Sequence, residues 1–408
     1  MKKIALLLVP ALFYADDLKS LLDFALSNNK MVQSRHLTQE AKSKELDSAK
    51  SSYFPTLDIG AYHQSKNERT PNLAGDIQSG YAKIGFDIYD GGKKSNTIKQ
   101  NEALLEEASL NTEYYKKSLQ LDVVQDFYTI KSTEATLKAL EDKKTQLAAD
   151  LERIRKFFSV GSATIDDVDK LQASYSNNLY QIEQVKYQLL SLTRLLSIKL
   201  GKNIATLEDA TVIPPASAQK ELSDNIKGLQ ASSASLQYAA ESISSAYYPQ
   251  LRLENTYNIF DYERTDALHP KGLDNQNTLM LTLNMRLFDN GAIAKQKEAV
   301  QLQKMALDMQ IKQLEESQDI NAELAAVKID TTKAQIQSAK QSLDAANSAY
   351  DVVAKKFEAG VVDNVAYLDA LSVKTNAKAQ YETALNALQI AYANYYFTMN
   401  HNIKDYIK

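Results

Sequence analysis

Four segments of the chain alternate between apolar and polar residues, as a β-strand does when its two faces meet different surroundings. In "QLRLENTYNI", which begins at residue 250, Leu251 and Leu253 share one face, and Arg252 and Glu254 share the other. The same alternation predicts strands over 56–65, 81–89, 250–260 and 278–288. Each predicted strand therefore has one apolar face and one face that carries polar or charged side chains.

Most of the remaining chain places apolar residues at alternating steps of three and four, which is typical of helices that pack as coiled coils. This spacing predicts long helices over 92–158, 163–200, 291–358 and 363–400. One such stripe consists of Ile336, Ala339, Leu343, Ala346, Tyr350, Val353 and Phe357. At ~1.5 Å per residue, a helix of about 65 residues is about 100 Å long, which exceeds an ordinary globular domain.

The predicted elements occur twice in the same order. The stretch "YFPTLDIGAY" at 53–62 returns as "YYPQLRLENTY" at 247–257, "FDIYDGG" at 86–92 as "MRLFDNG" at 285–291, and "FFSVG" at 157–161 as "FEAG" at 357–360. We therefore expect a first structural repeat over 16–200 and a second over 220–408, each starting with a further helix. The linker between them, 201–219, contains Pro214 and Pro215, which should break a continuous helix.

Proline and glycine mark the junctions between these predicted elements. A proline disfavours helical backbone in the residue before it, so Pro55 and Pro249 should end the two incoming helices. Gly91, Gly92 and Gly291 stand where a strand becomes a helix and a flexible backbone is needed. Glycine just past a long helix favours a left-handed cap, which predicts two hairpin tips with the residues Phe158, Val160, Gly161, Phe357, Gly360 and Val361.

Composition excludes several functions. The chain of 408 residues has 47 basic and 51 acidic residues, a net charge of −4 and no basic cluster, which argues against nucleic-acid binding. It has no cysteine, so disulfides, thiol catalysis and thiolate metal sites are excluded, and its four histidines show no metal-ligand spacing. The Walker, G-x-S-x-G and H-E-x-x-H motifs are absent. We therefore expect no enzyme, no cofactor and no metal site.

The first 15 residues, "MKKIALLLVPALFYA", combine two lysines with a short apolar run. This pattern predicts a secretory signal peptide at 1–15, too short for a membrane-spanning helix, and a buried N-terminal strand is the alternative. The rest of the sequence holds no apolar run long enough for a transmembrane helix. A membrane role would therefore depend on the strands.

The apolar strand faces lack an obvious partner, because the helix stripes are narrow and are needed for packing between helices. Strands of about ten residues with this alternation suit a transmembrane β-barrel with a polar lumen, although a soluble sheet over a core gives the same pattern. Four strands cannot close a barrel, which needs about eight, and open edges are not tolerated in hydrocarbon. A membrane role therefore requires two, three or four copies of the chain, and three copies would supply twelve strands.

Together, the signal peptide, the duplicated halves and the paired junction and turn motifs resemble the outer-membrane channel-tunnel family typified by TolC. The resemblance implies a mostly α-helical fold with β-strands. Long antiparallel coiled-coil helices would form a periplasmic α-barrel, and four strands per chain would contribute to the twelve-stranded transmembrane β-barrel of a homotrimer.

The same resemblance implies a function and partners. The protein would be the outer-membrane exit duct of a tripartite efflux or type I secretion system, in contact with outer-membrane lipid. A periplasmic adaptor (membrane-fusion) protein and an inner-membrane pump of the RND or ABC type would work with it. The alternative function is a periplasmic coiled-coil structural or adhesive protein without a pore.

The resemblance also assigns candidate roles near the hairpin tips. In the family, acidic residues on the returning helix of the second hairpin surround the constriction, and the matching positions here are Asp369 and Ala366. Asp369 is therefore the main gate candidate. Asp363 is a second candidate, although an N-cap of the returning helix explains it better. The six tip residues would face the adaptor, and turn chemistry alone explains them equally well.

Overall fold

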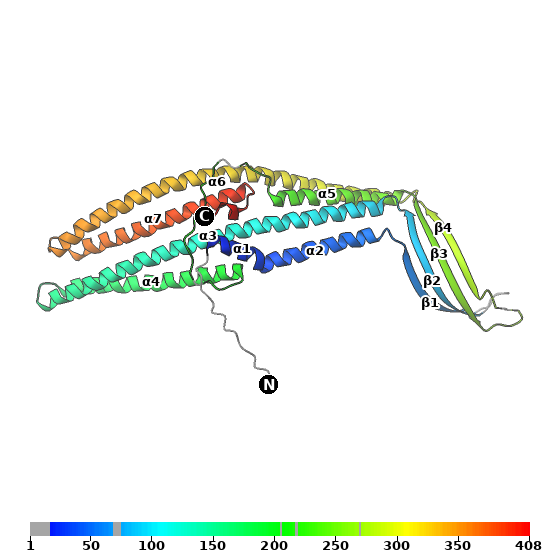
Figure 1. Ribbon diagram of the computed structural model, residues 1–408, viewed down its shortest axis with the longest axis horizontal. Helices are drawn as coiled ribbons and strands as arrows, with labels where there is room; N and C mark the ends of the chain where they lie inside the picture. The colour runs from blue at the N-terminus through cyan, green and yellow to red at the C-terminus, as the bar shows by residue number, and fades with distance from the viewer. Residues whose placement is uncertain (1–16, 68–74, 205, 217–218, 269–270) are drawn as a thin grey trace, which may run out of the picture. The chain divides into compact units, whose positions relative to one another are not determined.

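The computed structural model describes residues 17–67, 75–204, 206–216, 219–268 and 271–408. Its α-helices are α1 (Leu18–Asn28), α2 (Lys30–Ser51), α3 (Lys93–Ser159), α4 (Ile165–Leu200), α5 (Asp224–Ser244), α6 (Ala292–Glu358) and α7 (Asn364–Thr398) (Figure 1). Two short 3-10 helices are η1 (Ser245–Tyr247) and η2 (Ile403–Tyr406). Within this described part of the chain, no helix is long and apolar enough to cross a membrane. The predicted signal peptide at 1–15 lies outside the described residues.

The chain forms two compact units. Unit 1 consists of the residues up to Arg35, Thr112–Asp224 and Glu315–Lys408, and unit 2 consists of His36–Asn111 and Asn225–Leu314. Each unit takes segments from both halves of the sequence, so neither unit coincides with a predicted repeat. The repeat boundaries at 16–200, 201–219 and 220–408 remain sequence predictions.

Unit 2 contains a four-stranded antiparallel sheet with the strand order β1-β2-β3-β4. The strands are β1 (Thr56–Ser65), β2 (Asp76–Tyr89), β3 (Gln250–Glu263) and β4 (Asn275–Asn284). Figure 1 shows the four strands side by side in chain order. β1 and β4 are therefore the edge strands of this sheet.

Three strand predictions require correction, and the first is the strand predicted over 250–260, which extends to Glu263. The strand predicted over 81–89 begins at Asp76, because its pairing with β3 continues to Glu263. The strand predicted over 278–288 spans Asn275–Asn284 instead. It stops there because Asn284 pairs with Gln250, the first residue of β3, and the preceding Pro249 has no backbone N–H to donate.

The long helices differ from their predicted limits by one or two residues at most. α4 begins at Ile165 because the side chain of Thr164 accepts a hydrogen bond from the backbone N–H of Asp167, which fixes Thr164 as the N-cap. α7 ends at Thr398 because Asn400 has φ 66°, a left-handed conformation that a helix cannot include.

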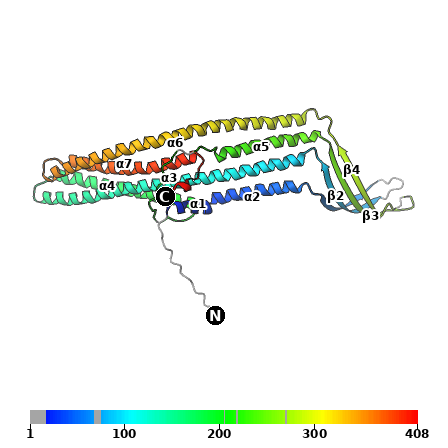
Figure 2. The same cartoon turned by 45° about the horizontal axis from the view of Figure 1, so that its top comes forward.

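In unit 1, α4, α3, α7 and α6 run alongside one another (Figures 1 and 2). Asn178 on α4 donates to the carbonyl oxygen of Leu140 on α3, and Lys378 on α7 pairs with Asp142 on α3 at 2.6 Å. α6 packs on α7 through Tyr350. α4 also contacts α7, because the side chain of Asn364 on α7 donates to the carbonyl oxygen of Asp167 on α4 at 3.0 Å.

The largest core of unit 1 joins α1, α3, α4, α6 and α7 to the last residues of the chain. Phe127 on α3 is fully buried in it, as are Leu196 on α4 and Ile403 of η2. The linker also reaches this core, because Val212 is buried and forms a β-bridge with Ile407. Residues 205, 217 and 218 of the predicted linker lie outside the described part.

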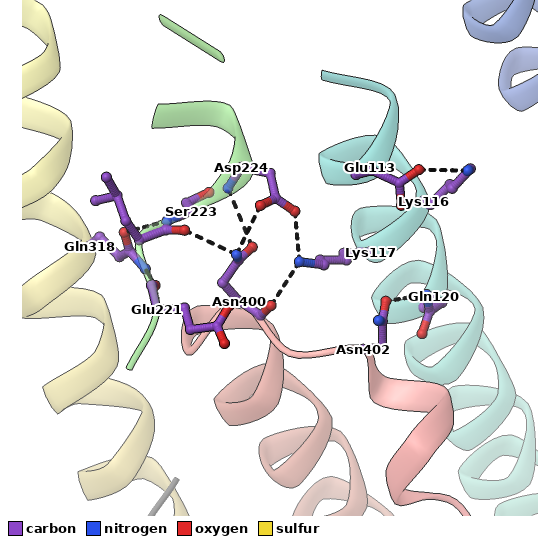
Figure 3. A network of polar contacts seen from close by, with 11 residues as sticks. Glu113, Lys116, Lys117, Gln120, Glu221, Ser223, Asp224, Gln318, Asn400 and Asn402 are labelled. Atoms are coloured by element: carbon purple, nitrogen blue, oxygen red, sulfur yellow. Dashed lines mark hydrogen bonds and ion pairs between the residues drawn. The ribbon is translucent and has the colours of Figure 1, made fainter. Parts of the chain in front are cut away.

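A buried polar network lies beside this core (Figure 3). Lys117 on α3 donates to the carboxylate of Asp224 and to the carbonyl oxygen of Asn400. The side-chain amide of Asn400 donates to Asp224 as well, and Gln318 on α6 donates to the carbonyl oxygen of Glu221. The network therefore connects α3, the start of α5, α6 and the end of α7.

Candidate functional site

The two faces of the sheet in unit 2 differ as the alternation predicts. Apolar side chains on one face are largely exposed: Leu57 is 64% exposed, Ile59 81%, Leu281 61% and Leu283 66%. The register places them on one side, since Leu57 pairs with Ile84 and Leu253 with Leu281. Within the described residues, a single chain therefore presents to solvent an apolar surface that no other element covers.

The opposite face carries ion pairs. Arg252 donates to Asp87 at 2.8 Å, and Lys94 approaches the other carboxylate oxygen of Asp87 at 3.0 Å. Lys83 lies 3.9 Å from Glu254 on the same face. Charged side chains on one face and aliphatic side chains on the other suit a sheet between an aqueous space and a hydrocarbon phase.

The two strand-to-helix junctions use the same chemistry. The carboxylate of Asp90 accepts hydrogen bonds from the backbone N–H groups of Gly92 and Lys94, at 3.0 and 2.7 Å. The carboxylate of Asp289 likewise accepts from Gly291 and Ile293, at 3.0 and 2.8 Å. Each aspartate thus satisfies the free N–H groups of a helix start, which a helix cannot satisfy internally.

Left-handed backbone accompanies both junctions, with φ 71° at Gly91, 85° at Gly92 and 79° at Gly291. At Gly91 the glycine is also needed for space, because a Cβ atom would collide with the carbonyl oxygen of Ser245 and lie 2.9 Å from the Cβ of Tyr248. The proline residues stand at the other type of junction, where a helix leads into a strand. Pro55 directly precedes β1, and Pro249 directly precedes β3.

The hairpin tips lie in unit 1, where α3 turns into α4 and α6 into α7. Gly161 has φ 76° and Gly360 φ 71°, and each follows its helix in a left-handed turn. The N–H of Ser162 reaches back to the carbonyl oxygen of Phe157 at 2.8 Å, and the N–H of Val361 does the same to Lys356. These bonds close both helix ends as a left-handed C-terminal cap does.

The two tips present different surfaces. In the first tip, Phe157, Phe158 and Val160 are exposed. In the second, Val361 is exposed, whereas Phe357 stacks on Tyr367 with ring centroids 4.5 Å apart. The first hairpin therefore offers the larger apolar tip.

A polar cluster behind the tips joins the two hairpins within unit 1. The Tyr367 hydroxyl on α7 donates to the carboxylate of Asp150 on α3 at 2.5 Å, and both residues are buried. Arg153 donates to the other oxygen of Asp150 at 3.0 Å, and Gln146 donates at 3.1 Å. The Tyr350 hydroxyl lies 3.3 Å from that of Tyr367.

Burial raises the pKa of Tyr367, and the hydrogen bond to Asp150 raises it further. Tyr367 therefore keeps its proton at any physiological pH and acts as a permanent donor to Asp150. Apolar contacts surround the pair: Leu147 and Leu151 on α3, Leu171 on α4, and Leu371 on α7. In this low-dielectric setting, a charge-assisted hydrogen bond is stronger than one in water.

The predicted gate residues do not belong to this cluster. The Asp363 carboxylate accepts from the backbone N–H of Ala366 at 2.9 Å, so Asp363 is the N-cap of α7. Asp369 is exposed, and within the described chain no hydrogen bond or ion pair holds it. Its carboxylate is therefore available to solvent or to a cation.

Sequence reasoning missed Asp150, Arg153 and Tyr367. The only signal was a charged residue beside the apolar stripe of the first long helix, since Asp150 adjoins Leu147, Leu151 and Ile154. That signal gives no partner, because Tyr367 is 217 residues away in the sequence.

A sequence model of the outer membrane efflux protein family matches residues 21–198 and 218–401. The chain belongs to this family. The outer membrane efflux protein family therefore accounts for both halves of the sequence.

Individual outer-membrane proteins are also similar to this chain over most of its length. Outer membrane protein TolC of Escherichia coli (strain K12) is 21% identical over 407 residues, covering 93% of this chain and 82% of TolC. The solved Campylobacter jejuni CmeC outer membrane channel gives a TM-score of 0.83 at 16% identity, covering 94% of this chain and 85% of CmeC. Outer membrane protein VceC from Vibrio cholerae gives 0.80 at 13% identity, with 95% and 96% covered. At these identities, the solved structures show a shared fold.

Membership in the outer membrane efflux protein family confirms several expectations. The family, the mostly helical fold with four strands, and the location in the outer membrane are as predicted from the sequence. The chain is an outer-membrane efflux duct protein, and its relatives are channels and not enzymes.

Proposed function

We propose that three copies of this chain close one continuous duct, which forms the passive exit of a tripartite efflux or type I secretion system. The observation that carries this proposal is the sheet of unit 2. Its apolar face is exposed in a single chain, and its edge strands β1 and β4 each pair on one side only. In a membrane, lipid would cover the apolar face, and the free edges would be tolerated only if further strands complete the sheet.

The size of the sheet supports three copies. Four strands from each copy give twelve, which is within the range of closed outer-membrane barrels. The ion pairs among Lys83, Asp87, Arg252 and Glu254 would then face the lumen, and the aliphatic face would meet lipid. A closed ring of identical copies also removes every free edge.

Unit 1 supplies the end at which partners would act. The exposed apolar tips around Phe158 and Val361 suit docking by a periplasmic adaptor, which in turn would connect the duct to an inner-membrane pump of the RND or ABC type. The turn geometry at Gly161 and Gly360 holds these side chains at the ends of the hairpins.

The hydrogen bond between Tyr367 and Asp150 would stabilise the closed state of the duct. It ties the α3–α4 hairpin to the α6–α7 hairpin, so the two hairpins cannot separate without breaking a buried, charge-assisted contact. Opening would therefore require a partner whose binding energy exceeds the cost of exposing Asp150 and Tyr367.

The experiment that tests the proposed function starts from outer membranes extracted in mild detergent. The native mass of the protein is compared with the 45.5 kDa of one chain. A species of three copies that forms ion-conducting pores in a planar bilayer is the expected result. A monomer or dimer without conductance would instead indicate a pore-free coiled-coil protein, whose apolar sheet face would then have no explanation.

A further inference from the structure

We infer the register in which neighbouring copies join, an inference that rests on the proposed assembly. β4 of one copy pairs antiparallel with β1 of the next, so that Leu283 lies opposite Ile59 of the second copy and Leu281 opposite Ala61. In this register the sequence numbers of any two directly facing residues add to 342. β1 and β4 both have 10 residues and both are edge strands, so they are the strands available for such a seam.

The faces of the two strands restrict the possible registers. On β1, the apolar face carries the odd-numbered residues Leu57 and Ile59, and on β4 it carries Leu279, Leu281 and Leu283. A shift of one residue moves every side chain of a strand to the opposite face. Only registers with an even sum, such as 340, 342 or 344, keep the aliphatic side chains of both copies on one surface.

The stagger of the sheet narrows the choice. One row of adjacent residues runs across the chain from Leu57 through Ile84 and Asn255 to Leu279. If Leu279 lies opposite His63 of the next copy, the row starts at residue 57 of β1 and reaches residue 63 of β1 in the next copy. The strands are therefore staggered by six residues per copy. With ~3.3 Å per residue and ~4.7 Å between strands, this stagger tilts the strands by about 46°.

Transmembrane strands are tilted by about 45°, which matches this register. The register with a sum of 340 gives a climb of four residues per copy and a tilt of about 35°, and the sum of 344 gives about 54°. The range of about 35–45° for outer-membrane barrels therefore excludes the sum of 344, whereas the sums of 340 and 342 lie at its lower and upper limits.

The sequence pattern beyond β4 supports the same choice. The apolar alternation continues to residue 288, whereas β4 ends at Asn284 and leaves Met285 exposed. β3 has no residue to pair with Met285, because Asn284 already meets the first residue of β3. In the proposed register, Met285 lies opposite Leu57 of the second copy, so the seam supplies the missing partner.

At the other end of the seam, one facing pair matches in polarity and the next does not. Asn277 accepts a hydrogen bond from Asn255 at 2.9 Å on the face that carries the leucines of β4. In the proposed register, Asn277 lies opposite Ser65 of the second copy, a polar residue. One unlike pair remains, between Leu279 and His63.

Disulfide trapping tests the register directly, because the chain has no cysteine of its own. The variant carrying Ile59→Cys and Leu283→Cys is expressed in full length, and its outer membranes are oxidised mildly. Directly opposed Cβ atoms are about 4.5–5.5 Å apart, close to the spacing that a disulfide requires, whereas partners offset by two residues are about 7–8 Å apart. Matched controls combine Leu283→Cys with Leu57→Cys or with Ala61→Cys.

The expected result is a shift from one chain to covalent species of two and three copies on a non-reducing gel, reversed by reductant, for the Ile59 pair. The Leu57 and Ala61 controls should remain mostly single chains. A pair made of Ala61→Cys and Leu281→Cys should behave like the Ile59 pair. The native mass of the same samples shows whether a trimer has formed. It therefore distinguishes a wrong register from a failure of the proposed assembly.

If the protein is a trimer but the Leu57 or the Ala61 control crosslinks best, the register is wrong and the proposed function stands. If no trimer forms, the proposed function fails. Absence of every crosslink in a protein that is trimeric would also overturn the pairing of β1 with β4.

Discussion

Lys117 on α3 and Asp224, the first residue of α5, form an ion pair with 2.6 Å between Nζ and Oδ2 (Figure 3). Both residues are buried, and Asn400 contacts each of them. A charge taken out of water is tolerated when it is paired and hydrogen-bonded, as both are here. The pair therefore anchors the start of α5 and the end of α7 to α3 in unit 1.

Replacing Lys117 by methionine should destabilise unit 1 strongly. The change keeps an unbranched side chain up to the ε position but removes the ammonium group that pairs with the buried carboxylate of Asp224, and breaking such a buried pair typically costs about 3–5 kcal/mol. Denaturant titration followed by the helical circular dichroism signal measures the effect. Lys116→Met is the matched control, because Lys116 pairs with the more exposed Glu113 and should change stability by less than about 1 kcal/mol. Equal effects of the two variants would contradict this role of Lys117.

Tyr367→Phe should open the duct more readily. The variant keeps the ring that stacks on Phe357 but removes the hydroxyl that donates to Asp150, and hydrogen bonds to charged groups contribute about 1.5–3 kcal/mol. We expect higher mean conductance in planar bilayers. Tyr350→Phe is the control, because its hydroxyl lies 3.3 Å from Tyr367 and does not contact Asp150 in this network. Wild-type conductance in Tyr367→Phe would show that this bond does not keep the duct closed.

Much of this architecture could be predicted from the sequence, because the relevant forces act locally. The alternation at Leu251–Arg252–Leu253 depends on neighbours within one strand, and the turn at Gly161 depends on the backbone freedom of one residue. Contacts between distant segments could not be predicted in this way. Asp150 carries no local mark of Tyr367, and Lys117 carries none of Asp224.

The end of β4 shows the same limit in a different form. Its alternation continues through Met285, but a strand also needs a partner, and the partner available within the chain begins at Gln250. The length of a strand is therefore a property of the pair. A single-sequence pattern describes only one member of that pair.

Acid should loosen the start of α4. Hydrogen bonds from the hydroxyl and the backbone N–H of Thr164 hold the pKa of Asp167 below its ordinary value of 3.8. The folded state therefore favours the ionised carboxylate, so its stabilisation is present above pH 3.8 and is lost as the pH falls through the lowered pKa. Hydrogen–deuterium exchange of the first turns of α4, corrected for intrinsic rates, should rise between pH 5 and pH 2.

Asp167→Asn provides the comparison for this pH dependence. Because the amide does not titrate, exchange in the variant should be faster than in the wild type at pH 5 and should change little with acid. Asp169→Asn, a neighbouring acid outside the capping box, should retain the wild-type profile. A wild-type profile in Asp167→Asn would mean that another group controls the start of α4.

Gly91→Ala should be far more damaging than Gly360→Ala. Both glycines have positive φ, where a side chain costs about 1–2 kcal/mol. At Gly91 the added Cβ would also collide with the backbone of Ser245, whereas nothing lies within 4 Å at Gly360. Heating in detergent, followed by the loss of the oligomer on native gels, compares the two variants. Similar losses would show that space at Gly91 is not limiting.

Asp369→Ala should reduce cation selectivity and block by divalent cations. Asp369 is exposed on α7 and free of partners within the described chain, so in the proposed trimer three such carboxylates would attract cations at the constriction. Reversal potentials across a salt gradient measure the selectivity. Asp363→Ala is the matched control, because it removes an equal charge whose observed role is to cap α7, at a cost of about 1 kcal/mol in stability. Loss of selectivity in Asp363→Ala but not in Asp369→Ala would assign the acidic ring to the cap position.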